Sequence, residues 1–201
     1  SPLSMSTRSM ETAVEAGAAL ARSLKIGLVQ MPVTSDKGEN INRAESSIDE
    51  AVRGGAELVL LPEIWNGPYA TTAFPDYAEK LPGVGGGVSS VIESSSPSSI
   101  MLLRKAQEHN VWLIGGSISE RSDNGDIYNT CLVVSPDGKV MGKHRKMHLF
   151  DIDVQKPKKM YFKESETLTA GDAFTLVDSP WGTIGVGICY DLRFPEMATV
   201  M

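Results

Sequence analysis

The pattern of apolar positions begins with a short run, continues as a helical stripe and then returns to a short run. Residues 25–31 are mostly apolar and are closed by Pro32, which predicts a strand. Apolar residues then recur at positions 41, 44, 48, 51 and 52, on one face of a helix that Gly54 and Gly55 end. Residues 57–61 are the second apolar run. This strand-helix-strand unit predicts two parallel strands.

The middle of the chain predicts a surface loop, a second helix and further strands. Residues 83–99 are rich in glycine and serine, which predicts a flexible surface loop. Ser98 or Ser99 is expected to cap a helix that runs to about Asn110. Strands are expected at residues 111–114, 127–134, 139–144, 174–177 and 183–188, the last of them buried. Together these elements predict an α/β fold with helices against a mixed sheet.

Composition and charge narrow the class of protein. The chain has 201 residues, of which 41% are hydrophobic and 22% charged, as in a soluble globular domain. The net charge of −6 argues against a general nucleic-acid binder, and no apolar run approaches the roughly 20 residues that span a bilayer. Residues 1–24 are interpreted as a disordered or helical leader, whose composition gives weak support to organellar import. With Cys131 and Cys189 as the only cysteines, we expect a reducing compartment, the cytoplasm.

Cys189 lies where a predicted strand turns into a helix. Asp191, Arg193 and Glu196 follow it at helical spacing. A cysteine in such a turn lies near backbone N–H groups and the positive end of a helix, so a lowered thiol pKa is expected. An isolated cysteine is more often a small apolar core residue, and Cys131 is interpreted in that way.

Two other segments carry candidate catalytic groups. Glu63 directly follows a predicted strand, at the kind of edge where ligand crevices form in α/β folds. His144 and His148 are four residues apart and could bind zinc on a helix, but the basic residues around them, including Lys146, disfavour a metal. A papain-like assignment would instead make one of these histidines the base for Cys189.

Three strings give these residues a common context: Leu-Leu-Pro-Glu-Ile-Trp-Asn (60–66), Arg-Lys-Met-His-Leu-Phe-Asp-Ile-Asp (145–153) and Cys-Tyr-Asp-Leu-Arg-Phe-Pro-Glu (189–196). Together they resemble the catalytic segments of the nitrilase superfamily of carbon–nitrogen hydrolases. The resemblance implies a nitrilase-like α-β-β-α sandwich over residues 25–201 and chemistry without metal or organic cofactor. It also implies that the catalytic residues are Glu63, Lys146 and Cys189, supported by Glu164, Tyr69, Tyr190 and Arg193.

Within the superfamily, the first two strings look most like the ω-amidase branch. That branch hydrolyses the terminal amide of 2-oxoglutaramate and 2-oxosuccinamate through a thioester, and its members are homodimers. Two alternatives stay open: another amidase of the superfamily, acting on deaminated glutathione or an N-carbamoyl amide, and an inactive binding protein. The resemblance further implies that the domain is C-terminally incomplete, so that only the N-terminal portion of the fold is present and the 201-residue chain by itself is inactive.

Overall fold

The computed structural model describes residues 23–92 and 95–201. The predicted leader, residues 1–24, lies almost entirely outside these ranges. Within the described ranges, no helix combines the length and the apolar character needed to cross a membrane.

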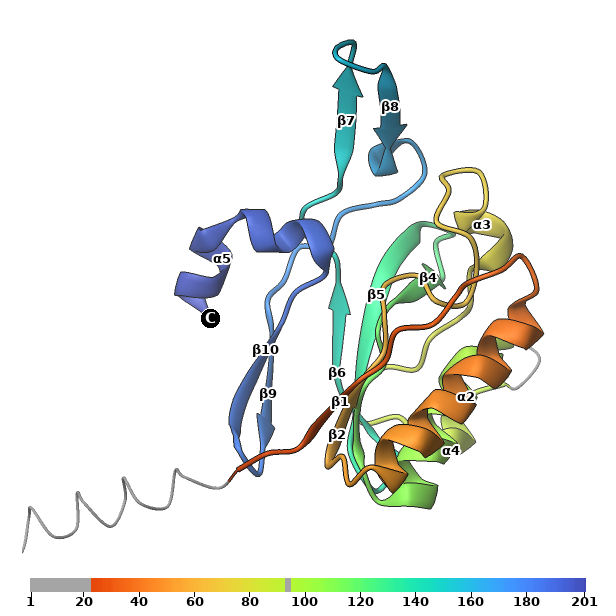
Figure 1. Ribbon diagram of the computed structural model, residues 1–201, viewed down its shortest axis with the longest axis vertical. Coiled ribbons are helices and arrows are strands. Elements are labelled where there is room, and N and C mark those ends of the chain that lie inside the picture. The colour runs from red at the N-terminus through yellow and green to blue at the C-terminus, as the bar shows by residue number, and fades with distance from the viewer. Residues whose placement is uncertain (1–22, 93–94) are drawn as a thin grey trace, which may run out of the picture.

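The main layer is a mixed sheet with strand order β1-β2-β3-β5-β4, in which β6 also pairs with β5. Strands β1, β2 and β3 are parallel, which confirms the strand-helix-strand prediction, and the other pairings are antiparallel. Helices α2 and α4 lie side by side on one face of this sheet (Figure 1). The strands of the sheet are β1 Ile26–Leu28, β2 Leu58–Leu60, β3 Trp112–Ile114, β4 Ile118–Arg121, β5 Ile127–Val134 and β6 Val140–Arg145.

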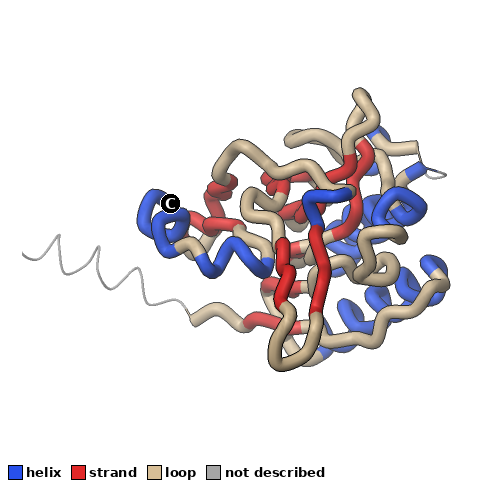
Figure 2. Tube along the Cα trace, turned by 90° about the horizontal axis from the view of Figure 1, so that it is seen from above, coloured by secondary structure: helices blue, strands red, loops and turns tan. Residues whose placement is uncertain are grey.

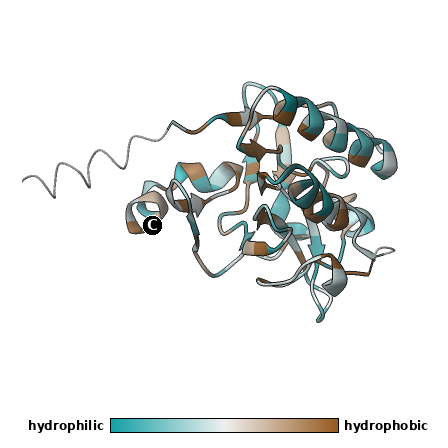
Figure 3. Ribbon diagram, turned by 90° about the horizontal axis from the view of Figure 1, so that it is seen from below, coloured by the Kyte–Doolittle hydropathy of each residue, from teal (hydrophilic) through white to brown (hydrophobic). Residues whose placement is uncertain are grey.

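Helix α2, Lys37–Arg53, has the predicted apolar face and ends at the predicted glycines. The side chain of Asp36 accepts a hydrogen bond from the Glu39 amide at 2.9 Å, and Gly54 is the C-cap. Its apolar stripe packs on the sheet, where Ala44 and Ile48 are fully buried. Figure 3 shows apolar and polar positions distributed around the helices in this way.

Helix α4, Pro97–His109, begins earlier than predicted. Ser96 is its N-cap, so the expected caps Ser98 and Ser99 lie inside the first turn and are buried. The buried carboxylate of Glu79 accepts hydrogen bonds from the Ser98 amide at 3.0 Å and the Ser98 hydroxyl at 2.7 Å. A side chain distant in sequence therefore caps this helix, which the local pattern could not reveal.

The second face of the sheet is covered by the hairpin of β9, Thr175–Ser179, and β10, Gly182–Val186. Val177, Val186 and Ile188 pack against Leu58 and Val133 of the sheet. The prediction of a fully buried strand at 183–188 is wrong, because alternate residues of β10 face away from the sheet and are exposed.

Helix α5, Pro195–Val200, lies on the outer side of β10. Met201, the C-cap of this helix, approaches the strand so closely that a Cβ on Gly185 of β10 would lie 3.4 Å from the Met201 sulfur. The layers therefore follow the order α-β-β-α, as expected, and Figure 2 shows them from above.

Strand β4 and one further hairpin were not predicted. Strands β7, Asp151–Val154, and β8, Met160–Lys163, pair with each other and project from the body of the molecule (Figure 1). They flank the charged tract 155–159, whose polar composition gave no strand pattern. The remaining short elements are α3 Phe74–Tyr77 and the 3-10 turns Val88–Ser90, Glu164–Glu166 and Cys189–Arg193.

Candidate active site

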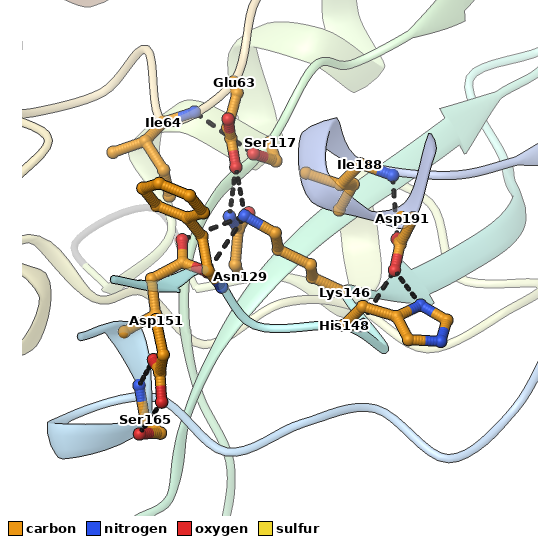
Figure 4. A network of polar contacts seen from close by, with 12 residues as sticks. Glu63, Ile64, Ser117, Asn129, Lys146, His148, Asp151, Ser165, Ile188 and Asp191 are labelled. Carbon is orange, nitrogen blue, oxygen red and sulfur yellow. Dashed lines mark hydrogen bonds and ion pairs between the residues drawn. The ribbon is translucent and has the colours of Figure 1, made fainter. Parts of the chain in front are cut away.

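The ends of three strands bring the three predicted catalytic side chains to one cleft. Glu63 follows β2, Lys146 follows β6, and Cys189 begins the 3-10 turn after β10. Glu63 and Cys189 line a cavity of about 790 Å³ together with Tyr69, Phe150, Tyr190, Leu192 and Arg193. Lys146 and Glu164 lie behind this lining with fully buried side chains. Figure 4 shows the polar contacts that join these segments.

Glu63 lies in a turn whose backbone is held by the neighbouring strand. Ile64 has a φ of 46°, a conformation that a β-branched residue rarely adopts. Its amide donates to the Ser117 hydroxyl at 3.1 Å. Gly116, with a φ of 61°, passes so close that a Cβ would lie 2.2 Å from the carbonyl oxygen of Pro62. The close approach of these two backbone segments fixes the direction of the Glu63 side chain.

The Lys146 ammonium joins two carboxylates. Its Nζ lies 2.9 Å from Glu63 Oε1 and 2.9 Å from Glu164 Oε1. Burial opposes the charge on Lys146, but the charges of Glu63 and Glu164 outweigh it and hold the lysine pKa above its ordinary value. Lys146 is therefore a permanent cation within the site.

Glu164 is a fully buried carboxylate whose oxygens are satisfied from three directions. Besides Lys146, the Tyr69 hydroxyl donates to Oε1 at 2.6 Å and the Phe150 amide donates to Oε2 at 2.7 Å. Burial and the hydrogen bond to Glu164 raise the pKa of Tyr69, so its hydroxyl stays protonated and acts as a donor. The fold thus places Glu164 in direct contact with Lys146.

The thiol of Cys189 does not have the environment expected from the sequence. Cys189 has a φ of 46° and an exposed side chain. Partial desolvation raises the thiol pKa above its ordinary value, and the carboxylates of Glu63 and Glu164 add to the increase, whereas Lys146 opposes it. The expected lowering is wrong, because desolvation and the two nearby carboxylates raise the thiol pKa more than the one lysine lowers it. The thiol therefore needs a base, and the carboxylate that interacts with it is Glu63.

Both histidines of the basic segment contact Asp191. His144 Nε2 lies 3.2 Å from Asp191 Oδ2, and His148 Nδ1 lies 2.8 Å from Asp191 Oδ1. Although burial opposes its charge, hydrogen bonds from His144, Ile188 and His148 lower the pKa of Asp191 to about 2. The papain-like alternative would need one of these rings to face Cys189, and both face Asp191. In the part of the chain that the structure describes, no group of three or more His, Cys, Asp or Glu side chains could hold a metal ion.

Sequence reasoning missed Asn129 and Asp191 as site residues. Asn129 is fully buried on β5, and its Nδ2 donates to Glu63 Oε1 at 2.8 Å. Its main-chain oxygen accepts from the Lys146 amide at 2.8 Å, so one residue contacts both Glu63 and the lysine segment. The signal that could have found it is the position of a polar residue within an otherwise apolar strand.

A second cavity, of about 280 Å³, lies elsewhere, among Lys80, Arg121, Asp123, Lys143 and Arg145. Its charged groups are already engaged: Lys80 lies 3.0 Å from Asp123, Arg145 makes two hydrogen bonds to Glu120, and Arg121 donates to the carbonyl oxygen of Pro75. No cysteine is among the described residues that line it, whereas the exposed thiol of Cys189 lies in the larger cleft.

Comparison with known proteins identifies the family to which the sequence is similar. The family model for carbon-nitrogen hydrolases matches residues 25–201. Omega-amidase NIT2-A of Xenopus laevis is 50% identical over 88% of this chain and 58% of its own length. The chloroplastic omega-amidase of Arabidopsis thaliana is 51% identical over 87% of this chain and 44% of its own length. The chain thus spans about half the length of these curated relatives.

Solved structures agree with the sequence relatives. The crystal structure of Saccharomyces cerevisiae Nit3, a member of branch 10 of the nitrilase superfamily, superposes with a TM-score of 0.75. It is 37% identical and covers 90% of this chain and 61% of its own length. A carbon-nitrogen hydrolase from Helicobacter pylori shares the fold, with a TM-score of 0.69 at 23% identity over 89% of this chain and 56% of its own length. The match over residues 25–201, together with the fold, shows that the chain belongs to the carbon-nitrogen hydrolase family.

Proposed function

We propose that the protein hydrolyses the terminal amide of a small carboxylic acid and releases ammonia, with 2-oxoglutaramate and 2-oxosuccinamate as substrates. The observation that carries the proposal is the meeting of Glu63 and Cys189 in one cleft, with Lys146 Nζ 2.9 Å from Glu63 Oε1. Relatives about half identical to this chain are named omega-amidases, which supports the choice of substrate class.

The first half of the reaction forms a thioester. Glu63 removes the thiol proton of Cys189, and the resulting thiolate attacks the amide carbon. The carbonyl oxygen becomes an oxyanion, which the Lys146 ammonium and the backbone N–H of Tyr190 stabilise. Glu63 then gives its proton to the amide nitrogen, the carbon–nitrogen bond breaks, and ammonia leaves.

The second half restores the enzyme. Glu63, again a carboxylate, removes a proton from water, and the hydroxide attacks the thioester carbon. The tetrahedral intermediate collapses, the carbon–sulfur bond breaks, and the Glu63 proton returns to the cysteine sulfur. The raised pKa of the Cys189 thiol is consistent with this scheme, because the thiol then needs a base to remove its proton. The same base, Glu63, can remove a proton from water in the second half of the reaction.

Glu164 keeps the lysine in place during both halves. Its two oxygens accept from Lys146, Tyr69 and the Phe150 amide, so the carboxylate is held rigidly within the fold. Three donors on one buried anion allow Lys146 little freedom to move. Glu164 and Tyr69 are therefore assigned to positioning, and Lys146 to charge stabilisation.

The lining of the cleft suits a short, acidic substrate. Tyr69, Phe150 and Tyr190 supply aromatic surface, and Arg193 supplies a positive charge at the wall. A guanidinium pairs with a carboxylate through two parallel hydrogen bonds, which orients the acid end away from Cys189. We assign Arg193 to the substrate carboxylate on this basis.

The proposal includes a homodimer in a reducing compartment. Both described cysteines are free, and a thiol nucleophile has to remain reduced to act. The cytoplasm meets this condition, while one curated relative is chloroplastic. Size-exclusion chromatography with light scattering and fractionation of cells test these two points.

The function is tested by ammonia release from a panel of amides. We expect the whole protein to release ammonia from 2-oxoglutaramate and 2-oxosuccinamate with a higher kcat/KM than from asparagine, deaminated glutathione or an N-carbamoyl amide. Preference for one of the latter two would assign the protein to another amidase class. Binding of 2-oxoglutaramate without ammonia release would identify a binding protein and reject the enzyme.

A further inference from the structure

Asp191 occupies a place in the molecule that the proposed reaction does not explain. The residue is 3% exposed and lies two positions after the nucleophile, yet no step of the reaction uses its carboxylate. A buried carboxylate is costly unless it is well paired, so its hydrogen bonds indicate its purpose.

The carboxylate ties two separate segments together. Oδ2 accepts from the Ile188 amide at 2.9 Å, which closes the turn that holds Cys189. Oδ1 accepts from the His148 amide at 2.8 Å and contacts the His148 ring at Nδ1, also at 2.8 Å. His148 lies two residues after Lys146, so this side chain joins the nucleophile turn to the lysine segment (Figure 4).

The histidines extend the link to the surrounding sheet. His144 is fully buried on β6 and lies with Nε2 3.2 Å from Asp191 and Nδ1 3.2 Å from the Thr175 hydroxyl on β9. The His148 ring stacks on Phe194, with centroids 3.7 Å apart, and Phe194 directly follows the nucleophile turn. Both rings are thus fixed on two sides, which makes them rigid partners for the carboxylate.

The backbone of Cys189 needs such support. A φ of 46° is an unfavourable backbone conformation for a residue with a Cβ, and it persists only where the surroundings impose it. If the turn relaxed to a right-handed conformation, the sulfur would swing away from Glu63.

We propose that Asp191, with His148 as its main partner, is a positioning residue that holds Cys189 in its left-handed conformation against the lysine segment. The proposal rests on the proposed function in that Cys189 is taken as the nucleophile. It assigns to the His144–His148 pair a role in orienting the nucleophile.

The test compares substitutions in the whole protein, in a Cys131→Ser background so that Cys189 is the thiol that reacts. In Asp191→Asn, one carboxylate oxygen becomes an NH₂ group, which cannot accept a hydrogen bond. This group has to face the Ile188 amide or the His148 amide, so one of the two hydrogen bonds is lost. We expect kcat for 2-oxoglutaramate to fall about 10²-fold with KM within about twofold, because a displacement of about 1 Å has this effect on rate. Alkylation of Cys189 by iodoacetamide should slow in parallel. Asp178→Asn is the control, since Asp178 is exposed on β9 and contacts only the Thr183 hydroxyl among the hydrogen bonds found.

Two further variants keep the test decisive if Asp191→Asn does not fold. His148→Asn retains an N–H donor near the Nδ1 position, whereas His148→Leu removes it while keeping a similar volume. We expect His148→Asn to keep most of the alkylation rate and kcat, and His148→Leu to lose roughly 10-fold in both, the effect of a lost hydrogen bond to a charged group.

The outcomes separate this proposal from a merely structural role and from the proposed function. Folded Asp191→Asn protein with wild-type kcat and alkylation rate, or equal behaviour of the two His148 variants, would overturn the positioning role even if the melting temperature fell. If the wild-type protein does not hydrolyse 2-oxoglutaramate, the proposed substrate is wrong, and the alkylation rates still decide the role of Asp191.

Discussion

Ile64 and Cys189 have the same left-handed φ of 46°, in the two turns that bring Glu63 and Cys189 to one cleft. Ile64 is held there by the Ser117 hydroxyl, and the Cys189 turn is held by Asp191. Neither residue is a glycine, so both turns carry strain that the surrounding contacts offset. The proposed base and nucleophile are therefore both aimed by backbone geometry, and substitutions in the supporting contacts are expected to affect rate more than binding.

Replacement of the nucleophile is expected to abolish turnover. Cys189→Ser removes the thiol, and a serine hydroxyl forms the attacking anion far less readily. Cys131→Ser is the matched control, because Cys131 is buried in the core and burial raises its thiol pKa to about 12. Ammonia release from 2-oxoglutaramate measures both. Equal losses in the two variants would contradict the assignment of Cys189.

Glu63→Gln is expected to separate thiol ionisation from catalysis. Apart from desolvation, the Glu63 carboxylate is the main cause of the raised thiol pKa of Cys189, so its neutralisation should lower that pKa. Thiolate absorbance should then appear at lower pH than in the wild type, while ammonia release is lost because the base is missing. The titration is followed at 240 nm with Cys131→Ser in both proteins. A Cys189 pKa that stays unchanged or rises would show that Glu63 does not act on the thiol.

Lys146→Gln is expected to lower kcat by about 10²–10³, the usual effect of a lost oxyanion donor. It also leaves Glu63 and Glu164 without their shared cation, and breaking a buried pair costs about 3–5 kcal/mol of unfolding free energy. Lys139→Gln is the control, since Lys139 is exposed and pairs with Asp137 at the surface. Stopped-time ammonia assays and urea unfolding measure the two effects. Wild-type kcat in folded Lys146→Gln protein would make the lysine a structural cation only.

Asn129→Leu is expected to reduce kcat/KM by roughly 10-fold or more, because a hydrogen bond to a charged acceptor is worth about 1.5–3 kcal/mol. Stability should change little, since the Oδ1 atom of Asn129 is buried without a partner in the described structure and a leucine removes that cost. Ser119→Ala is a suitable control, as its buried hydroxyl also lacks a partner and lies outside the cleft. Unchanged kinetics with a lower melting temperature would assign Asn129 to folding alone.

Gly116→Ala is expected to destabilise the protein and disturb Glu63. The left-handed conformation alone costs on the order of 1–3 kcal/mol, and the new Cβ would lie 2.2 Å from the carbonyl oxygen of Pro62. Gly125→Ala, also at positive φ but in open space, separates the two effects. We expect both variants to unfold at lower urea concentration and only Gly116→Ala to lose activity. Equal activity in both would show that the backbone contact does not direct Glu63.

The local pattern of the sequence was sufficient for the elements that depend on near neighbours. Helix α2 follows from its apolar stripe and its terminal glycines, and the parallel pairing of β1 and β2 follows from the helix between them. The three strings that contain Glu63, Lys146 and Cys189 could be recognised in the sequence, because each is a short contiguous string that resembles a segment of a known family.

What the tertiary structure decided depends on contacts between distant segments. The carboxylate of Glu79 sets the start of α4, and the face of β10 that meets the sheet decides which of its residues are exposed. The pKa of Cys189 depends on desolvation and on the charges of Glu63, Glu164 and Lys146. Asn129 and Asp191 became visible as site residues only when the chain brought them to Glu63 and His148. Periodicity reports which face of an element is apolar, whereas caps, charge balance and the direction of a side chain arise between segments that only the folded chain brings together.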